Sequence, residues 1–429
     1  MPPAVRTRLA TTISLPSDCV PLPAPGRRVP LSSFDAHWAA LPPVCHVFLF
    51  PAPSPPRPSQ DIARALRSSL AAVLQAFHPL AGEVAYSPDS RTVSIVLGDD
   101  ARVAFVEAET DLAFARLVVE GAEYEQDVDA LRQLVPDIRR DELPAPVMAV
   151  QVTEFVGGDG CVAVGLAVHH AAVDGRGLWR FIEMWAAAAA AAAAGVHQGR
   201  VTGNPAPPLQ DRSLVSFDGD EEVAGVFLRQ VTPDLPRVSH LPKRLAAATG
   251  VRTPPSTFAA LAAHGWVSLA RASGFTDGAP VFAAFLADCR ALISPLAPDD
   301  YAGNCVVPCM ISLNGEELAG ADGPARAFLA IREAVEDVRR DPLADCSRWI
   351  TKFDEMRAGR TVVLAGSSRF PAYAVDFGFG RPVRVEKTSL NHDGEISLLA
   401  GREAGSVQAS VVLSSDKMPA FREMFGVDV

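Results

Sequence analysis

The stretch Cys161–Gly175, which reads CVAVGLAVHHAAVDG, places an apolar run directly before His169 and His170. Such a run is typical of a β-strand, and the residues from His170 onward form the pattern His-x-x-x-Asp-Gly. Beyond this pattern, apolar residues recur with the spacing of one helix face, at Leu178, Phe181, Ile182 and Trp185. The stretch therefore predicts a strand, a turn that carries His170, and a helix. A base on such a turn can meet a substrate at the end of the strand.

Similar patterns predict further elements on both sides of this stretch. Apolar runs and turn residues predict strands over Val44–Phe50, Val147–Phe155, Cys161–Val168, Val281–Leu286, Ile396–Ala400 and Val407–Leu413. Helical spacing and alanine content predict helices over Asp61–Phe77, Gly175–Ala194, Pro255–Ala272, Pro324–Asp341 and Met418–Phe425. The rest of the first 60 residues is rich in proline and is expected to be extended.

Residues 196–213 contain several glycines and prolines and have no apolar period. This composition is typical of a linker. The sequence thus predicts an N-terminal domain over residues 1–195 and a C-terminal domain over residues 214–429. Mixed strands and helices in both halves favour an α/β or α+β fold, with the active site where the two domains meet.

The overall composition excludes several classes of protein. The chain has 429 residues, and its 48% hydrophobic content is that of a globular protein with a large core. Its net charge of −11 argues against nucleic-acid binding, so local basic residues must hold any anionic ligand. No uninterrupted apolar stretch of about 18 residues is present, and no signal peptide is evident. We expect a cytoplasmic protein without membrane or nucleic-acid partners.

Seven scattered cysteines do not form a disulfide framework, and their apolar surroundings indicate reduced thiols. Cys305 and Cys309 have the C-x3-C spacing, but no second pair of ligands follows. His169 and His170 are adjacent, so side chains at a strand end would point to opposite faces and could not easily share one ion. We expect no metal site.

The spacing of His170 and Asp174 leaves more than one function open. A neutral imidazole, with an ordinary pKa of about 6.5, accepts protons near neutral pH. Asp174 could orient that ring or brace the turn; a short acidic residue beside Gly175 at a helix start favours bracing. On spacing alone, a histidine pair of this kind is more often structural than catalytic. Nucleophilic catalysis lacks support, because the chain has no GxSxG elbow and no cysteine with a flanking motif.

A resemblance narrows these alternatives. His170-x-x-x-Asp174-Gly175 and the later Asp376-Phe377-Gly378-Phe379-Gly380 resemble, in this order, the HxxxD and DFGWG signatures of the plant BAHD acyl-CoA-dependent acyltransferases. Other segments are also similar to family patterns, and the resemblance extends over essentially the whole chain: Leu31–Asp35, Phe77–Gly82, Asp211–Ser213, Ser256–Phe258 and Asp288–Arg290. Phe379 departs from the usual tryptophan and lacks its N–H donor.

The resemblance implies a fold and a mechanism. It implies a two-domain chloramphenicol-acetyltransferase-like fold with mixed sheets, flanking helices and a channel between the domains. His170 would deprotonate an acceptor that attacks the thioester of acyl-CoA directly, without an acyl-enzyme. Asp174 would pair with Arg290 instead of with His170. Asp376, Gly378 and Gly380 would be structural. The resemblance implies a monomer with no permanently bound cofactor, and acyl-CoA as its co-substrate.

The resemblance also suggests the substrates. Tyr301-Ala302-Gly303-Asn304-Cys305 looks like the YFGNC motif of the anthocyanin and flavonoid-glycoside clade, which commonly uses malonyl-CoA. A malonyl carboxylate needs a nearby cation, and Arg176 could bind it with two parallel hydrogen bonds. Residues expected to contact acyl-CoA are Arg176, Ser256, Ser367 and Arg369. Residues expected in the acceptor pocket are Trp38, Thr388 and Asn391.

Two alternatives stay open at this point. The enzyme could instead transfer a hydroxycinnamoyl or acetyl group from CoA to an oxygen or nitrogen atom of the acceptor. Such a donor would not need Arg176. A non-catalytic binding protein with the same fold would not need His170. The leading hypothesis is transfer of an acyl group, most readily malonyl, to a hydroxyl group of a phenolic or flavonoid glycoside.

Overall fold

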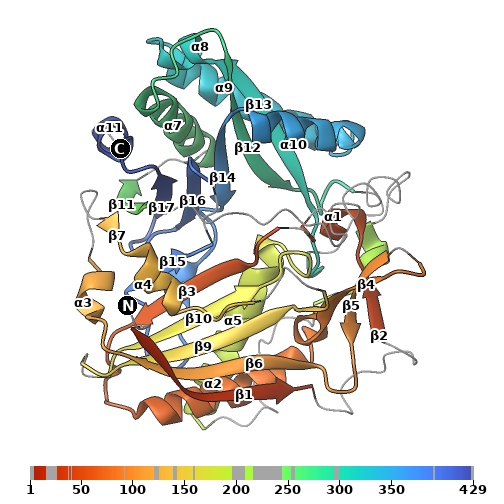
Figure 1. The fold of residues 1–429 in the computed structure, drawn as a ribbon, viewed down its shortest axis with the longest axis vertical. Helices are drawn as coiled ribbons and strands as arrows, with labels where there is room; N and C mark the ends of the chain where they lie inside the picture. Colours follow the sequence, from red (N-terminus) through yellow and green to blue (C-terminus); the bar gives the residue numbers. More distant parts are fainter. Residues whose placement is uncertain are drawn as a thin grey trace.

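The computed structural model shows two sheet-based halves stacked along the long axis of the molecule (Figure 1). It describes residues 4–15, 27–36, 38–39, 41–90, 92–119, 125–138, 143–157, 160–195, 208–215, 244–252, 257–293, 299–389 and 392–426. Most of the predicted linker, residues 196–207, lies outside the described residues. The division into domains at residues 195 and 214 stays a prediction.

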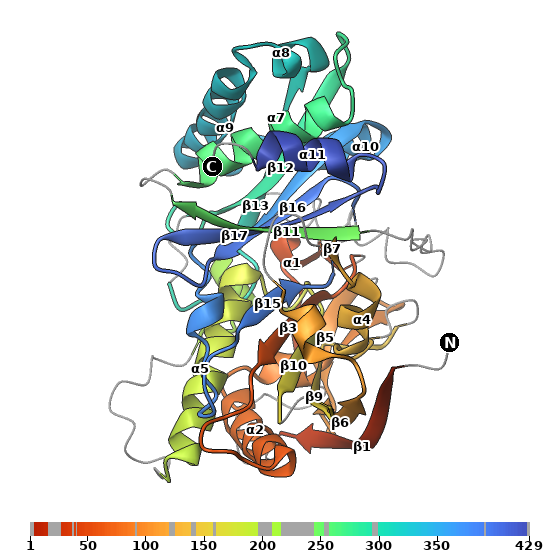
Figure 2. The ribbon, with the colours of Figure 1, turned by 90° about the vertical axis from the view of Figure 1, so that its left-hand side faces the viewer.

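The N-terminal half is built on a six-stranded sheet that carries the opening stretch at its centre. The sheet has the order β1 (Val5–Ser14), β6 (Arg102–Thr110), β9 (Met148–Phe155), β10 (Val162–Val168), β3 (Val44–Phe50) and β15 (Arg384–Lys387). Helices α2 (Ser59–Leu74) and α5 (Gly175–Ala193) cover one face, and α4 (Val128–Gln133) packs on the other (Figure 2). All seven residues of β10 are buried because both of its faces are covered, which explains its unbroken apolar run.

A small sheet flanks this half, in the order β2 (Arg27–Pro30), β5 (Thr92–Leu97), β4 (Glu83–Ser87) and β8 (Ala145–Pro146). The N-terminal half also contains the short helices α1 (Ser33–Ala36) and α3 (Phe114–Leu117). The sequence did not predict β1, β4, β5 or β6. The edge strand β1 is largely exposed, with Ile13 as its one buried residue, so it has no apolar run to reveal it.

The C-terminal half is built on a seven-stranded sheet. Its order is β13 (Val306–Asn314), β12 (Pro280–Asp288), β14 (Arg360–Gly366), β16 (Glu395–Ala400), β17 (Ser406–Leu413), β11 (Arg244–Arg252) and β7 (Glu125–Gln126). Helices α7 (Thr257–Ala272), α9 (Gly323–Arg340) and α11 (Met418–Phe425) cover one face. Helix α8 (Gly315–Ala319) contacts α7 and α9, and α10 (Trp349–Ala358) contacts β14. The predicted helices and the late hairpin appear with shifts of a few residues at their ends.

Two strands cross between the halves. β15 lies between β14 and β16 of the second half in sequence but pairs with β3 of the first sheet. β7 lies within the first half in sequence but pairs with β11 of the second sheet. The end of the predicted linker is also ordered: Leu209 bridges to Tyr301, and Arg212 is buried. The two halves are therefore joined by strand pairing as well as by packing. Among the described helices, none is long and apolar enough to cross a membrane.

Candidate active site

A large cavity of about 2220 Å³ lies between the two halves and is lined by His170. Side chains alternate along strands, so one face of the second sheet packs on its helices while the other faces this cavity. Alternate residues of β16 accordingly line the cavity, namely Glu395, Ser397 and Leu399, and so do the end segments 284–288 of β12 and 363–366 of β14. The cavity thus brings both halves to His170.

His170 lies in the turn between β10 and α5. Its ring stacks on Trp38, with ring centroids 3.9 Å apart and planes 11° apart. Burial lowers the pKa of His170 to about 4, so the ring is neutral at neutral pH and available as a base. The side-chain amide of Asn304 donates to the backbone carbonyl of His170 at 2.9 Å. The preceding His169 is turned away: its Nδ1 accepts from the backbone N–H of Ala171 at 3.2 Å.

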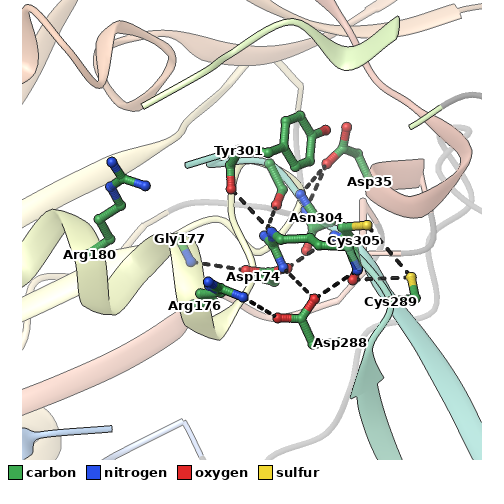
Figure 3. A network of polar contacts seen from close by, with 12 residues as sticks. Asp35, Asp174, Arg176, Gly177, Arg180, Asp288, Cys289, Tyr301, Asn304 and Cys305 are labelled. Carbon is green, nitrogen blue, oxygen red and sulfur yellow. Dashed lines mark hydrogen bonds and ion pairs between the residues drawn. The ribbon is translucent and has the colours of Figure 1, made fainter. Parts of the chain in front are cut away.

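Asp174 caps the N-terminus of α5 and holds the turn. Its Oδ1 accepts from the backbone N–H of Gly177 at 3.0 Å. Its Oδ2 accepts from Arg290 Nη2 at 2.8 Å and from the backbone N–H of Cys305 at 3.0 Å. Figure 3 shows these contacts converging on the Asp174 carboxylate. Each of these three bonds leads from the turn to the helix or to the C-terminal half, and none involves the His170 ring.

The Tyr301–Cys305 segment wraps around the same turn. Arg290 donates from Nε to the carbonyl of Tyr301 at 3.2 Å and from Nη2 to that of Gly303 at 2.8 Å. A side chain at Gly177 would meet the Ala302 carbonyl at 2.2 Å, so only glycine allows this close approach. The motif that suggested a donor preference from sequence therefore also supports the turn that carries His170.

A second buried pair, which the sequence analysis did not identify as part of the site, supports the turn from another side. Arg212 Nε lies 3.2 Å from Asp35 Oδ2, and Arg212 Nη2 donates to the carbonyl of Ala172 at 2.6 Å. Asp35 Oδ1 accepts from the side chain of Asn304 at 2.8 Å. The signals were present in the Leu31–Asp35 and Asp211–Ser213 segments, but nothing local indicated that they meet.

Arg176 lines the cavity on the first turn of α5. Its guanidinium donates to Asp288 Oδ2 at 3.0 Å (Figure 3). It also donates to Asp299 Oδ1 at 3.1 Å. The side chain of Arg176 is 44% exposed and that of Asp299 is 87% exposed, so solvent weakens the second pair. A ligand carboxylate would have to compete with these two aspartates for the guanidinium.

The other predicted contact residues divide into three groups. Trp38, Ser367 and Arg369 line the cavity. Thr388 is buried and its backbone N–H donates to the carbonyl of Cys45 at 2.9 Å, while its neighbours Lys387 and Ser389 line the cavity. The third group, Ser256 and Asn391, lies outside the described residues.

The Asp376–Gly380 loop lies away from the cavity lining. Asp376 Oδ1 accepts from the backbone N–H groups of Gly378 at 2.7 Å and of Gly380 at 3.0 Å. Gly378 has a φ of +89°, and a side chain there would meet the Ala193 side chain of α5 at 2.8 Å. Phe379 packs edge-on against Phe50 at 4.9 Å, so a phenyl ring fills this position. The loop ties the β15 region to the end of α5, the helix that starts after the turn that carries His170.

The described residues contain no group of three or more His, Cys, Asp or Glu side chains that could hold a metal ion. Of the two cysteines with C-x3-C spacing, Cys305 has its thiol 3.6 Å from that of Cys289 instead.

The comparisons with known proteins agree with this geometry. The profile of the Transferase family matches residues 11–427. The chain belongs to this family, the BAHD acyltransferases. It is 27% identical to phenolic glucoside malonyltransferase 1 of Arabidopsis thaliana, over 91% of each chain. It is 25% identical to the malonyl-coenzyme A:anthocyanin 3-O-glucoside-6''-O-malonyltransferase of Dahlia pinnata, over 93% of each.

Solved structures show the same BAHD fold. Vinorine synthase superposes with a TM-score of 0.71 at 19% identity, covering 97% of this chain and 96% of that one. TRI101 of F. graminearum, solved with ethyl coenzyme A, has a TM-score of 0.61 at 14% identity, covering 92% and 96%. The predicted α/β fold of mixed sheets and helices is confirmed. As a BAHD family member, the protein is an acyltransferase that uses acyl-CoA as its co-substrate.

Proposed function

We propose that this enzyme transfers a malonyl group from malonyl-CoA to a hydroxyl group of a phenolic glucoside. Two lines of support converge. The relatives named above are malonyltransferases for phenolic and anthocyanin glucosides, and each matches over nine-tenths of the chain. The observation that carries the proposal is the neutral His170 on the wall of a cavity that both halves line.

His170 acts as the general base in this mechanism. It accepts the proton of the acceptor hydroxyl, and the hydroxyl oxygen attacks the thioester carbonyl to form a tetrahedral oxyanion. The C–S bond then breaks, and the thiolate of CoA leaves and takes up the proton from the imidazolium. No covalent acyl-enzyme forms. The stacked Trp38 ring and the buried turn keep the imidazole in one orientation, which general-base catalysis requires.

Asp174 and Arg290 are positioning residues in this proposal, because they hold the turn that presents His170. Arg176 binds the malonyl carboxylate by exchanging its contact with the exposed Asp299 for a bidentate one with the donor. Ser256, Ser367 and Arg369 contact the CoA moiety, while Trp38, Thr388 and Asn391 contribute to the acceptor pocket. Asp376, Gly378 and Gly380 serve the fold.

We further propose that the enzyme works as a monomer in the cytoplasm. The six cysteines in the described ranges form no disulfide bond with one another, which supports a reducing compartment.

The test is a donor and acceptor panel. Purified protein is mixed with phenolic glucosides and with malonyl-CoA, acetyl-CoA or coumaroyl-CoA. A thiol reagent measures the release of CoA, and mass spectrometry identifies the products. We expect the highest kcat/KM with malonyl-CoA and a mass gain of one malonyl group on the glucoside. A preference for coumaroyl-CoA would show that the transferred group is coumaroyl and not malonyl. Ligand binding without CoA release from any donor would favour a non-catalytic protein.

A further inference from the structure

A buried ion pair joins the two sheets on the wall of the catalytic cavity. Lys387 Nζ, from the end of β15, lies 2.7 Å from Glu395 Oε1, at the start of β16. The side chains are 15% and 5% exposed. β15 is the edge strand of the first sheet on the side toward the second sheet (Figure 1), and the ion pair links its last residue to the first residue of β16. Both residues line the same cavity as His170.

The strand register explains why these groups face the cavity. Lys387 pairs directly with His46 of β3, so the two side chains project from the same face of the first sheet. Glu386, one residue earlier, projects from the opposite face, where it accepts from Arg384 and Ser410. On β16, Ile396 packs into the core while Glu395 faces the cavity. The placement of the pair is therefore a property of the sheet geometry.

His46 adds a third polar group to this wall. Burial, reinforced by the charge of Lys387, lowers the pKa of His46 to about 3, so its ring stays neutral. Nδ1 of His46 is buried and has no hydrogen-bond partner among the described residues. His46, Lys387 and Glu395 all line the same cavity as His170, and the charge of Lys387 also contributes to the lowered pKa of His170. We call Lys387, Glu395 and His46 the polar wall.

Stability alone does not account for a buried ion pair at this place. Removing two charges from water costs free energy that their attraction only balances, and apolar residues of similar volume are often as stabilising. A paired ammonium and carboxylate beside a cavity can instead bind a diol: one hydroxyl oxygen accepts from the ammonium, and a neighbouring hydroxyl donates to the carboxylate. Sugar rings carry such neighbouring hydroxyl groups, and the orphaned nitrogen of His46 offers a further partner.

We propose that the polar wall is the subsite that binds the sugar ring of the acceptor. This inference rests on the proposed function, in which the acceptor is a glucoside, and it adds the residues that recognise the sugar. The ring hydroxyl groups bound by Lys387 and Glu395 anchor the sugar so that its reacting hydroxyl group reaches His170. The aromatic part of the acceptor lies elsewhere in the cavity.

The experiment compares two acceptors that share an aryl group. Naphthyl β-glucoside carries the sugar, whereas naphthyloxyethanol carries one primary hydroxyl group and no ring. The double variant K387M/E395M keeps the side-chain volumes and removes both charges of the pair, so it avoids the penalty of burying either one without the other. Binding is measured by calorimetry without donor, and KM is measured with malonyl-CoA. K352M, which removes a lysine paired with Asp345 outside the cavity lining, is the matched control.

We expect the double variant to raise the Kd and the KM for the glucoside at least about tenfold, the effect of losing hydrogen bonds to charged groups. Values for naphthyloxyethanol and malonyl-CoA should change less than about twofold, and K352M should leave all of them unchanged. Equal glucoside affinity in folded wild type and double variant, or equal loss for both acceptors, overturns the inference. Sugar-selective loss of binding in a protein that never transfers malonyl supports the subsite and refutes the proposed donor.

Discussion

Asp174 and Arg290 form an ion pair of 2.8 Å in which each side chain is only 1% exposed. Asp174 begins the helix after the catalytic turn, and Arg290 follows β12 of the second sheet, so the pair ties that turn to the other half of the molecule. Arg290 also has Asp288 within 3.1 Å, and its charge is therefore shared between two carboxylates. The position of His170 consequently depends on contacts between the two halves of the molecule.

Breaking this pair should destabilise the protein. D174A or R290A leaves one buried charge without its partner, and we expect each to lower the free energy of unfolding by about 3–5 kcal/mol. Urea denaturation followed by fluorescence measures the loss. R326A, which breaks the exposed pair with Glu317, should cost less than about 1 kcal/mol. Equal costs at the buried and exposed pairs would contradict the bracing role.

Removing the base should leave the fold but not the activity. We expect H170A to lower kcat by about 10²–10⁴-fold, the contribution of a general base, while the circular dichroism spectrum stays that of the wild type. H170Q, which keeps more of the side-chain volume against Trp38, should be equally inactive. H264A, which removes a histidine of α7 bound to the carbonyl of Phe425, serves as the control and should retain kcat. Near-normal turnover in H170A would refute the mechanism.

Acidification should unfold the protein through its buried histidines. Burial lowers the pKa of His46 to about 3 and those of His78 and His170 to about 4. The unfolded chain binds these protons near pH 6.5 and the folded chain does not, so stability is present above that pH and is lost as pH falls toward 4. Each group contributes up to about 1.4 kcal/mol per pH unit in that window.

Urea unfolding measured between pH 4 and 8 tests this directly. The glutamine of H46Q cannot take up the proton. The free energy of unfolding should therefore fall less steeply with decreasing pH, by the contribution of one histidine. An unchanged slope in H46Q would show that His46 does not titrate with unfolding.

Arg176 should govern donor choice. R176A removes the guanidinium that we assign to the malonyl carboxylate, so we expect KM for malonyl-CoA to rise about tenfold or more and KM for acetyl-CoA to change little. D299N, which weakens a competing contact of Arg176, should lower KM for malonyl-CoA. Steady-state kinetics with both donors measure these effects, and equal changes for the two donors in R176A would count against the assignment.

Arg212 should support catalysis from the second pair. R212M removes the donor to the Ala172 carbonyl inside the catalytic turn and leaves Asp35 charged and buried. We expect a loss of about 3–5 kcal/mol in stability and a lower kcat with little change in KM. R212M/D35N removes the lone charge and should recover part of the stability. Failure of the second change to recover any stability would mean that lost packing, not the buried charge, sets the cost.

The local elements around His170 could be predicted because their signals are local. The apolar run of β10, the helix spacing of α5 and the capping residue Asp174 all act within one turn or one strand. The ends of α2 were less well predicted: the helix ends at Leu74, because His78–Ala81 continues as a separate turn of 3-10 helix around Pro79. The edge strand β1 gave no signal, since its exposed faces select no apolar pattern.

The residues of the candidate site also divide into those that a local motif identified and those that only the structure identified. His170 and Asp174 were identified from their motif, and Arg290 was matched to Asp174 through the family resemblance. Spacing alone left open whether Asp174 orients the ring or braces the turn, and the positions of Gly177 and Cys305 show which atoms it binds. Lys387 and Glu395 carry no motif, and neither was identified before the sheets were seen together.

The sequence by itself determined the strand, turn and helix that present His170, because periodicity and capping depend on neighbours a few residues apart. Only the tertiary structure decided which distant residues meet at that turn. Asp35, Arg212, Asn304 and Arg290 come from segments far apart in the chain, and their contacts exist only once two sheets have packed. Lys387 faces Glu395 because β15 crosses into the first sheet, and no local interaction along the chain specifies that crossing.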